Sequence, residues 1–294
     1  MTNPETTPAN ALRLISDFSV EMTGKQKDID DLREAAPLLP AGTRVNVTFL
    51  GNENLEMRIA ASKAVLELGF TPVPHVSARR LHSEAELTEF LAALQEIGAS
   101  KHIFSVGGDP AEPMGPYGSS LEVIQSGLLP QYGVEDVSIA GYPEGHPDIA
   151  SDVLWRELEG KAVSLREQNL SGVILTQFGF DTDPVASWVN DVRGRGIDFP
   201  IRIGTPGPAG IKRLINFAKR FGVGANAMIV KKYGFSLTNL IGTAGPDKFI
   251  TELGDLLAAK ESAGDVGLHF YTFGGMTATS KWAQEFTARQ EAAK

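Results

Sequence analysis

The sequence predicts an α/β protein and, within that class, a (β/α)₈ TIM barrel. Eight short apolar runs recur along the 294 residues, and amphipathic stretches with helical periodicity separate them. Alternating strands and helices imply parallel pairing through right-handed crossovers, and eight such units fit a chain of this length. The alternative is a doubly wound sheet, but the first run leads into VEMTGKQKD rather than a glycine-rich nucleotide-binding turn.

The predicted strands are rich in apolar and β-branched residues, as expected for strands buried on both faces. They span residues 15–21, 44–49, 71–76, 101–106, 136–141, 172–178, 199–204 and 267–273. We expect a single barrel domain over residues 1–294, with a disordered tail over residues 1–10. The stretch 223–265 carries more helical pattern than one unit needs, so we expect an extra helix there.

The clearest predicted helix covers residues 83–98. Ser83 is a candidate N-cap with Glu86 three residues later, the pattern of a capping box. Gly98 follows the last apolar position, where glycine commonly ends a helix. The stretch 54–69 ends in the same way, so two neighbouring helices have predictable boundaries.

Composition excludes several classes of function. The net charge of −9 argues against binding to nucleic acid or to an acidic membrane surface. The absence of cysteine removes disulfides, thiolate catalysis and zinc–thiolate sites, and the five histidines lie too far apart in sequence to suggest a metal site. No apolar run is long enough to cross a membrane, and MTNPETTPAN lacks the layout of a signal peptide. We therefore expect a cytoplasmic protein without a metal.

Polar side chains stand where the predicted strands end, which is where barrel enzymes place their chemistry. They are Glu21, Thr48, His75, Asp109, Tyr142 with His146, Gln177, and Tyr271 with Thr272. One acid among amides, hydroxyls and aromatic rings suits a flat, hydrogen-bonding heteroaromatic ligand. An acid in a largely apolar site can have a raised pKa and donate a proton.

Each of these residues also has a purely structural interpretation. Glu21 could be a rim carboxylate paired with a cation, and Asp109 could be a turn residue in Gly-Asp-Pro. His75 could be a buried core histidine, and Tyr142 could serve packing alone. The set as a whole favours a binding site, because a barrel does not require a polar group at every strand end.

Six motifs along the chain resemble the methylenetetrahydrofolate reductase family. They are DFSVEM (17–22), PHV (74–76), GGDP (107–110), AGYPEGHP (140–147), LTQFGFD (175–181) and HFYT (269–272). They occur in the family's order over nearly the whole chain, and the pair AGYPEGHP and LTQFGFD is the most specific. The resemblance implies reduction of 5,10-methylenetetrahydrofolate to 5-methyltetrahydrofolate with hydride from NADH or NADPH, a step of one-carbon metabolism and methionine biosynthesis.

The resemblance also implies roles for individual residues. Glu21 would be the general acid that protonates N10 of the folate and opens its five-membered ring. Asp109 and Gln177 would hold the pterin, and Phe217 would pack on the nicotinamide or the substrate, with Tyr271 as a further substrate contact. Four residues fall where the family contacts its flavin: Thr48, His75, Tyr142 and His146.

Departures from the family pattern concern the flavin phosphates. An arginine that precedes Gly-Asp in flavin-containing members is replaced by Gly107, and an acid of the following motif by Ser120. Asp152, Lys161 and Arg166 do not align with the family's nucleotide-binding aspartate and lysine, and an Asn-Arg pair becomes Gly274 and Gly275. Loss of charge-assisted contacts to phosphate favours the family's short branch, in which hydride passes directly from nicotinamide to folate without FAD.

Several alternatives stay open from sequence. The same reaction could depend on FAD, or a barrel lyase could form a Schiff base through Lys231. A folate-binding protein without catalysis is a third hypothesis. Arg79 and Arg80 could meet the 2′-phosphate of NADPH, and Arg213 could meet nicotinamide phosphates. Homo-oligomerisation is left open.

Overall fold

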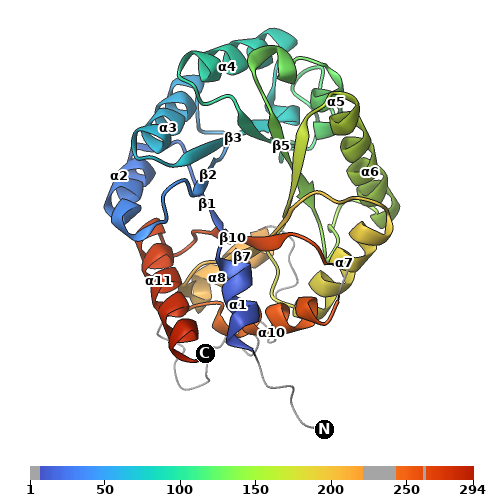
Figure 1. The fold of residues 1–294 in the computed structure, drawn as a ribbon. Helices are drawn as coiled ribbons and strands as arrows, with labels where there is room; N and C mark the ends of the chain where they lie inside the picture. Colours follow the sequence, from blue (N-terminus) through green and yellow to red (C-terminus); the bar gives the residue numbers. More distant parts are fainter. Residues whose placement is uncertain (1–6, 221–242, 261–262) are drawn as a thin grey trace. The chain divides into compact units, whose positions relative to one another are not determined.

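The computed structural model describes residues 7–220, 243–260 and 263–294. Eight parallel strands form a closed barrel in the order β1-β10-β7-β6-β5-β4-β3-β2 (Figure 1). Helices separate successive strands along the chain, so the predicted (β/α)₈ fold class is confirmed. A short antiparallel ribbon, β8 (Ala209–Gly210) with β9 (Thr243–Ala244), lies outside the barrel sheet.

The barrel strands fall close to their predicted positions. They are β1 (Ser19–Met22), β2 (Arg44–Val47), β3 (Thr71–Ser77), β4 (His102–Val106), β5 (Asp136–Gly141), β6 (Ser171–Thr176), β7 (Ile201–Pro206) and β10 (Val266–Tyr271). The predicted start of the first strand at Ile15 was wrong, because Ile15 ends a helix and the strand begins at Ser19. The buried residues Ala11, Leu14 and Ile15 have the i, i+3, i+4 spacing of a helix face, and this periodicity prevails over the apolar run that follows.

Ten α-helices can be assigned in the described residues. They are α1 (Pro8–Ile15), α2 (Gln26–Ala35), α3 (Leu55–Glu67), α4 (Glu84–Glu96), α5 (Ser120–Gln125), α6 (Ser151–Glu167), α7 (Thr182–Gly194), α8 (Ile211–Arg220), α10 (Asp247–Ala258) and α11 (Met276–Ala292). Helix α1 begins inside the stretch 1–10 for which we expected a tail, and α10 lies within 223–265. The described residues also contain three short 3₁₀ helices, η1 (Ala36–Leu38), η2 (Ala78–Arg80) and η3 (Leu129–Tyr132).

The predicted boundaries of α4 are confirmed, but the predicted capping box is not formed as expected. The Ser83 hydroxyl accepts a hydrogen bond from the Glu86 N–H (3.1 Å), as the N-cap prediction requires. The Glu86 carboxylate, however, accepts from the His82 N–H (2.7 Å), one residue before the position that a capping box would use. Gly98 has a φ of +77°, which is the left-handed stop that the sequence predicted.

The chain forms two compact units. The N-terminal unit comprises Ser19–Gly141 and Asp152–Leu175, and the C-terminal unit comprises Met1–Phe18, Tyr142–Ser151 and Thr176–Lys294. In the N-terminal unit Glu21 pairs in register with Asn46. In the C-terminal unit His269 pairs with Gly204, and α1 packs on α10 and α11. The expectation of one domain over residues 1–294 stays a prediction.

Charged side chains at the amino ends of the strands are paired within each unit. In the N-terminal unit, Asp136 accepts a hydrogen bond from Arg44 (3.1 Å) and lies 3.4 Å from His102 Nδ1. In the C-terminal unit, the Arg202 guanidinium pairs with Asp265 (3.0 Å) and with Asp17. Asp136 and Arg202 are buried, and a buried charge is tolerated when it is paired, so these pairs serve the fold.

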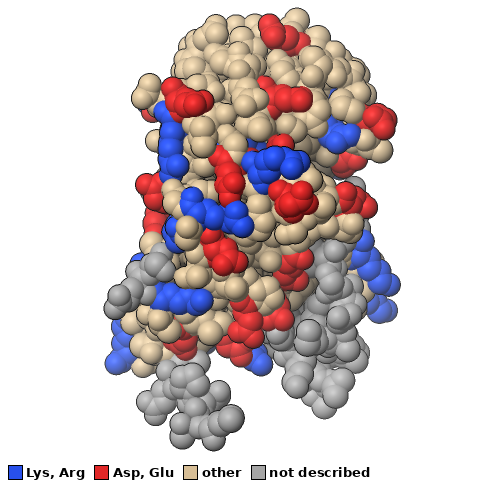
Figure 2. Space-filling view, turned by 90° about the vertical axis from the view of Figure 1, so that its right-hand side faces the viewer, with Lys and Arg blue, Asp and Glu red and all other residues tan. Residues whose placement is uncertain are grey.

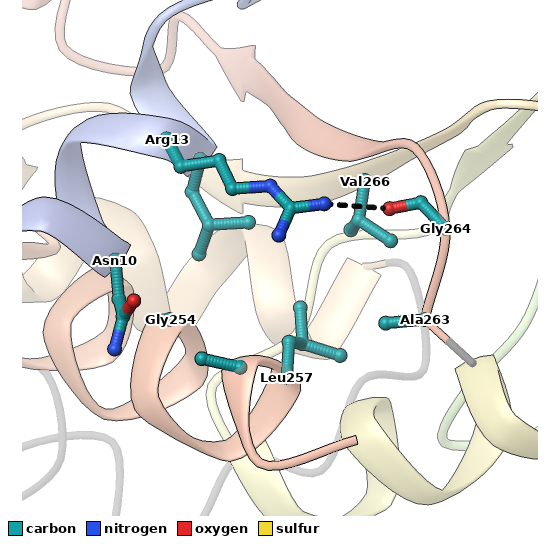
Figure 3. A pocket seen from close by; sticks show the side chains of 9 residues that line it. Asn10, Arg13, Gly254, Leu257, Ala263, Gly264 and Val266 are labelled. Atoms are coloured by element: carbon teal, nitrogen blue, oxygen red, sulfur yellow. Dashed lines mark hydrogen bonds between the residues drawn. The ribbon is translucent and has the colours of Figure 1, made fainter. Parts of the chain in front are cut away.

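A small cavity lies between α1 and α10 in the C-terminal unit (Figure 3). Its volume of about 20 Å³ is enough for one water molecule and far too small for a substrate. The Arg13 guanidinium donates to the Gly264 carbonyl (3.2 Å) beside it. The lining residues are Asn10, Arg13, Leu14, Gly254, Leu257, Ala258, Ala263, Gly264 and Val266.

Charges of both signs are interspersed on one face of the protein (Figure 2). On the face shown in Figure 2, Lys and Arg side chains alternate with Asp and Glu without a broad patch of one sign. In the part of the chain that the structure describes, every helix is too short or too polar to cross a bilayer.

Lys161, on the buried side of α6, generates a prediction about pH. Burial lowers the pKa of Lys161 from 10.5 to about 8, although Glu157 opposes the shift. Between these two values the unfolded chain binds more protons than the folded protein, so the free energy of unfolding should rise as pH increases from 8 to 10.5. Lys161→Met should remove this rise. It should also increase the free energy of unfolding at pH 7 by roughly 3 kcal/mol, because no charge has to be buried.

Urea unfolding at pH 7, 8, 9 and 10 measures this effect. The exposed residue Lys63, on α3, offers a matched control, and Lys63→Met should keep the wild-type pH dependence. An unchanged pH profile in Lys161→Met would show that the amine is solvated in solution.

Candidate functional site

The nine residues predicted for the site divide between the two units. The N-terminal unit contains Glu21, Thr48, His75 and Asp109, and the C-terminal unit contains Tyr142, His146, Gln177, Phe217 and Tyr271. In each unit, all but Phe217 lie in or just after the carboxyl halves of strands. Phe217 lies on α8, away from any strand end.

Glu21 has a polar neighbour in register. Glu21 on β1 pairs with Asn46 on β2, and paired residues of parallel strands project from the same side of the sheet. Thr48 follows β2 directly. Asn46 Oδ1 and Thr48 Oγ1 are buried, and neither has a hydrogen-bond partner among the described residues. Buried polar atoms are costly without a partner, so this end of β1 and β2 fits a ligand or ordered water.

The end of β3 brings His75 and Ser77 close to the loop after β4. His75 is buried and packs edge-on against Phe104, with ring centroids 4.8 Å apart. Gly108 has a φ of +95°, and a Cβ atom there would overlap Ser77 Oγ. The Gly-Gly-Asp-Pro loop therefore requires glycine at position 108, both for its backbone conformation and for this close approach.

Asp109 takes part in an ion pair. Its carboxylate accepts a hydrogen bond from Arg80, which lies on the 3₁₀ turn after β3. The neighbouring Arg79 donates to the Ala111 carbonyl, and its N–H bonds the Gly107 carbonyl (2.9 Å). Both arginines therefore bond to the loop after β4. Asp109 lies in a turn and also forms an ion pair that joins this loop to the turn after β3.

Sequence reasoning missed Glu53, which joins two loops of the N-terminal unit. The Glu53 side chain is buried, and its carboxylate accepts from the N–H groups of Gly24 and Leu50, both at 2.7 Å. Burial raises the pKa of Glu53, and the two backbone hydrogen bonds oppose this shift. Gly24 belongs to the loop after β1 and Leu50 to the loop after β2, so Glu53 fixes the segments that follow Glu21 and Thr48. An acidic residue just before an expected helix start was the available signal.

Arg58 contacts the loop after β2 through the ring of Phe49. Its guanidinium lies between the rings of Phe49 and Phe90, at 3.6 and 4.2 Å from their centroids. Burial lowers the pKa of Arg58 to about 10, and the negative charges of Glu86 and Glu53 act in the opposite direction. Cation–π contacts thus stabilise a charge that is nearly removed from solvent.

In the C-terminal unit, the YPEGHP loop holds its own side chains in place. The rings of Tyr142 and His146 meet edge to face, 5.5 Å between centroids. Burial raises the pKa of the Tyr142 phenol. His146 Nδ1 accepts the Asp148 N–H (3.1 Å), which places the proton of the neutral imidazole on Nε2. Glu144 accepts the Phe180 N–H (3.3 Å), so the loop also fixes the segment after β6.

The segments after β6 and β10 form an aromatic cluster. The Gln177 amide oxygen accepts the Phe178 N–H (3.1 Å), and the Tyr271 hydroxyl donates to the Thr176 carbonyl (3.1 Å). Phe178 packs against Tyr271 at 5.3 Å and against Phe273 at 5.2 Å between ring centroids. Tyr271 therefore contacts Thr176 and Phe178, the residues on either side of Gln177.

Phe217 joins this cluster through Phe273. The two rings are stacked, with centroids 3.9 Å apart and planes 7° apart. The Arg213 guanidinium donates to the Phe273 carbonyl (2.9 Å), which ties α8 to the loop after β10. One face of Phe217 is therefore covered by Phe273, a partner that sequence reasoning did not identify.

The Gly274-Gly275 pair after β10 has a steric cause. A Cβ atom at Gly274 would overlap the Pro208 carbonyl oxygen, and Gly275 has a φ of +109°. Glycine is required at position 274 because the backbone there passes close to the Pro208 carbonyl, and it is favoured at position 275 by the left-handed backbone conformation. Within the described ranges, no group of three or more His, Asp or Glu side chains could hold a metal ion.

Comparison with known proteins gives a consistent family. A profile of the family "Methylenetetrahydrofolate reductase" matches residues 22–282. Methylenetetrahydrofolate reductase 1 of Schizosaccharomyces pombe is 30% identical over 142 residues, covering 46% of this chain and 22% of that protein. A probable methylenetetrahydrofolate reductase (NADH) of Oryza sativa subsp. japonica is 28% identical over 114 residues, which cover 34% of this chain and 19% of that protein. The matches thus span about a fifth of these longer relatives.

A search of solved structures finds dihydropteroate synthases. The enzyme of Thermus thermophilus has a TM-score of 0.47 and 14% identity, with 92% of each chain covered. That of Burkholderia cenocepacia has a TM-score of 0.47 and 15% identity, with 94% of this chain and 92% of the other covered.

Glu53 generates a prediction about stability. In Glu53→Gln, one amide oxygen remains and an NH₂ group faces one of the two backbone N–H donors, so a buried donor loses its acceptor. We expect a loss of about 2 kcal/mol in the free energy of unfolding at pH 7. Glu96→Gln, at an exposed position on α4, should change it by less than about 0.5 kcal/mol. Equal effects of the two substitutions in urea unfolding would contradict the assigned role.

Proposed function

The chain belongs to the methylenetetrahydrofolate reductase family, and on that premise we propose that it reduces 5,10-methylenetetrahydrofolate to 5-methyltetrahydrofolate with hydride from a nicotinamide nucleotide. The family match, with an acid at the end of β1, is the observation that carries the proposal. We further propose that the hydride passes directly from the nucleotide to the folate, without FAD.

The reaction needs one proton and one hydride. Glu21 donates a proton to N10, the bond between N10 and the methylene carbon breaks, and an iminium forms at N5. The C4 hydride of the dihydronicotinamide then adds to the methylene carbon, which leaves a methyl group on N5 and an oxidised nicotinamide. An iminium is electrophilic enough to accept this hydride when the two carbons are held in contact.

The other residues take binding roles. Asp109 and Gln177 hydrogen-bond the pterin, and Phe217 and Tyr271 provide apolar surface for the rings. The four residues at the family's flavin contacts, Thr48, His75, Tyr142 and His146, would contact the nicotinamide nucleotide instead. The buried, unpartnered oxygen of Thr48 supports such a contact, since a ligand N–H or O–H could satisfy it.

The residues present do not fit the phosphates of a flavin. Gly107, at the place of the family's arginine, has open space where a side chain would begin. Lys161 is buried on α6, and Asp152 lies beside Arg156 (3.8 Å) on the same helix. A pyrophosphate would lack its charge-assisted contacts at these positions. These observations support direct hydride transfer.

We propose NADH rather than NADPH as the donor. Arg79 and Arg80, which sequence analysis considered for a 2′-phosphate, contact the Ala111 carbonyl and Asp109. The Oryza sativa relative is also named as an NADH enzyme. With both arginines engaged, NADH should show a kcat/KM at least about tenfold above that of NADPH. Initial rates with each nucleotide measure this ratio, and a preference for NADPH would contradict the proposal.

Glu21 provides the direct test of the chemistry. Glu21→Gln keeps size and hydrogen bonding but has no acidic proton, so kcat should fall by about 10²- to 10⁴-fold. The assay follows NADH oxidation by methylenetetrahydrofolate under anaerobic conditions, on protein without flavin absorbance. Glu34→Gln, at an exposed position on α2, is the control and should keep wild-type turnover.

Other outcomes of this assay identify the alternatives. Turnover near wild type in Glu21→Gln would remove Glu21 from the acid role. Activity that requires added FAD would favour the flavin-dependent reaction, and folate binding without turnover would indicate a binding protein. A lyase would be detected by borohydride trapping at Lys231, a residue outside the described ranges.

A further inference from the structure

We infer that Arg80 is a positioning residue for Asp109, so that its guanidinium orients the carboxylate for the pterin ring of the folate. This inference rests on the proposed function, in which Asp109 hydrogen-bonds the pterin. Arg80 lies on a different loop from Asp109, and the sequence suggested Arg80 only as a contact for a nucleotide phosphate.

The ion pair is asymmetric in its exposure. Arg80 Nη2 donates to Asp109 Oδ1, and the side chains of the two residues are 15% and 72% exposed. Among the described residues, Asp109 Oδ2 has no further hydrogen bond. The arginine is therefore largely shielded, while the carboxylate keeps one oxygen open to a ligand.

The loop after β2 fixes the guanidinium from the other side. A Cβ atom at Gly51 would lie 2.6 Å from Arg80 Nη1, so the guanidinium packs directly on the backbone there. Arg80 Nε is buried without a hydrogen-bond partner in the described part of the chain. Hydrogen bonding is thus incomplete at Arg80, and its place is set by contact with Gly51 and by the charge of Asp109.

A fixed partner lowers the entropy that Asp109 loses when a ligand binds. A carboxylate on an exposed loop samples several rotamers, and binding must freeze one of them. Arg80 removes that freedom before the ligand arrives, so less affinity is lost on binding. The effect should appear in folate affinity, with little effect on the nicotinamide nucleotide.

Arg79 is a matched control on the same turn. Its guanidinium donates to the Ala111 carbonyl instead of the Asp109 carboxylate. The two arginines are adjacent, partly buried and bonded to the same loop. Arg79→Gln therefore removes equal charge and similar loop support without touching the Asp109 carboxylate.

The experiment measures KM for methylenetetrahydrofolate, KM for NADH and kcat in purified full-length variants. Arg80→Gln should raise KM for the folate about tenfold and change KM for NADH less than twofold. Arg79→Gln should change both constants less than twofold. Gly51→Ala, which keeps both charges and displaces the guanidinium, should raise KM for the folate in the same direction as Arg80→Gln.

A double variant tests whether Arg80 acts through Asp109. In an Asp109→Asn background, adding Arg80→Gln should cause no further rise in KM for the folate, because the carboxylate to be oriented is already gone. Equal effects of Arg80→Gln and Arg79→Gln, or additive effects with Asp109→Asn, would overturn the inference while leaving the reductase intact. A wild-type protein without turnover would instead mark failure of the proposed function.

Discussion

Parallel strand pairing is the constraint on which the rest of the structure depends. Every barrel strand runs in the same direction as its neighbours, so the chain must return through a helix after each strand. Within each unit this places all loops that follow strands at one edge and all loops that precede strands at the other. The paired charges of Arg44 with Asp136 and of Arg202 with Asp265 occupy the amino ends. The carboxyl ends carry the residues proposed for chemistry.

Polar side chains that bond from one loop to another then give the loops a defined geometry. Glu53 joins the loops after β1 and β2 through two backbone N–H groups. Arg80 joins the loop after β3 to Asp109, and Glu144 joins the YPEGHP loop to the segment after β6. Each of these hydrogen bonds joins two segments, which restricts the motion of the segments next to the proposed acid and binding residues. Preorganised groups of this kind lose little entropy when a ligand binds.

Sequence predicted the strands well because each is a short run rich in apolar and β-branched residues that is followed by a helical pattern. It failed at the first strand, where Ile15 completes a helix face rather than beginning the strand. Polar residues at strand ends were identified from position alone. The residues that hold them in place were not recognised in that role. Glu53 and Phe273 were missed, and Arg80 was considered only for a nucleotide phosphate, because all three act through contacts between loops. Such contacts leave no periodicity in the sequence, and they become visible only when the strand register fixes which loops are neighbours.

Direct hydride transfer from nicotinamide to folate is the central claim. Single-turnover reduction with NADH deuterated at the transferred position of C4, in ordinary water, tests it most directly. Direct transfer predicts deuterium in the new methyl group of 5-methyltetrahydrofolate, because the hydride never leaves the two reactants. A flavin relay would pass the label through N5 of the reduced flavin, where it exchanges with water. A product methyl group without deuterium would therefore contradict direct transfer.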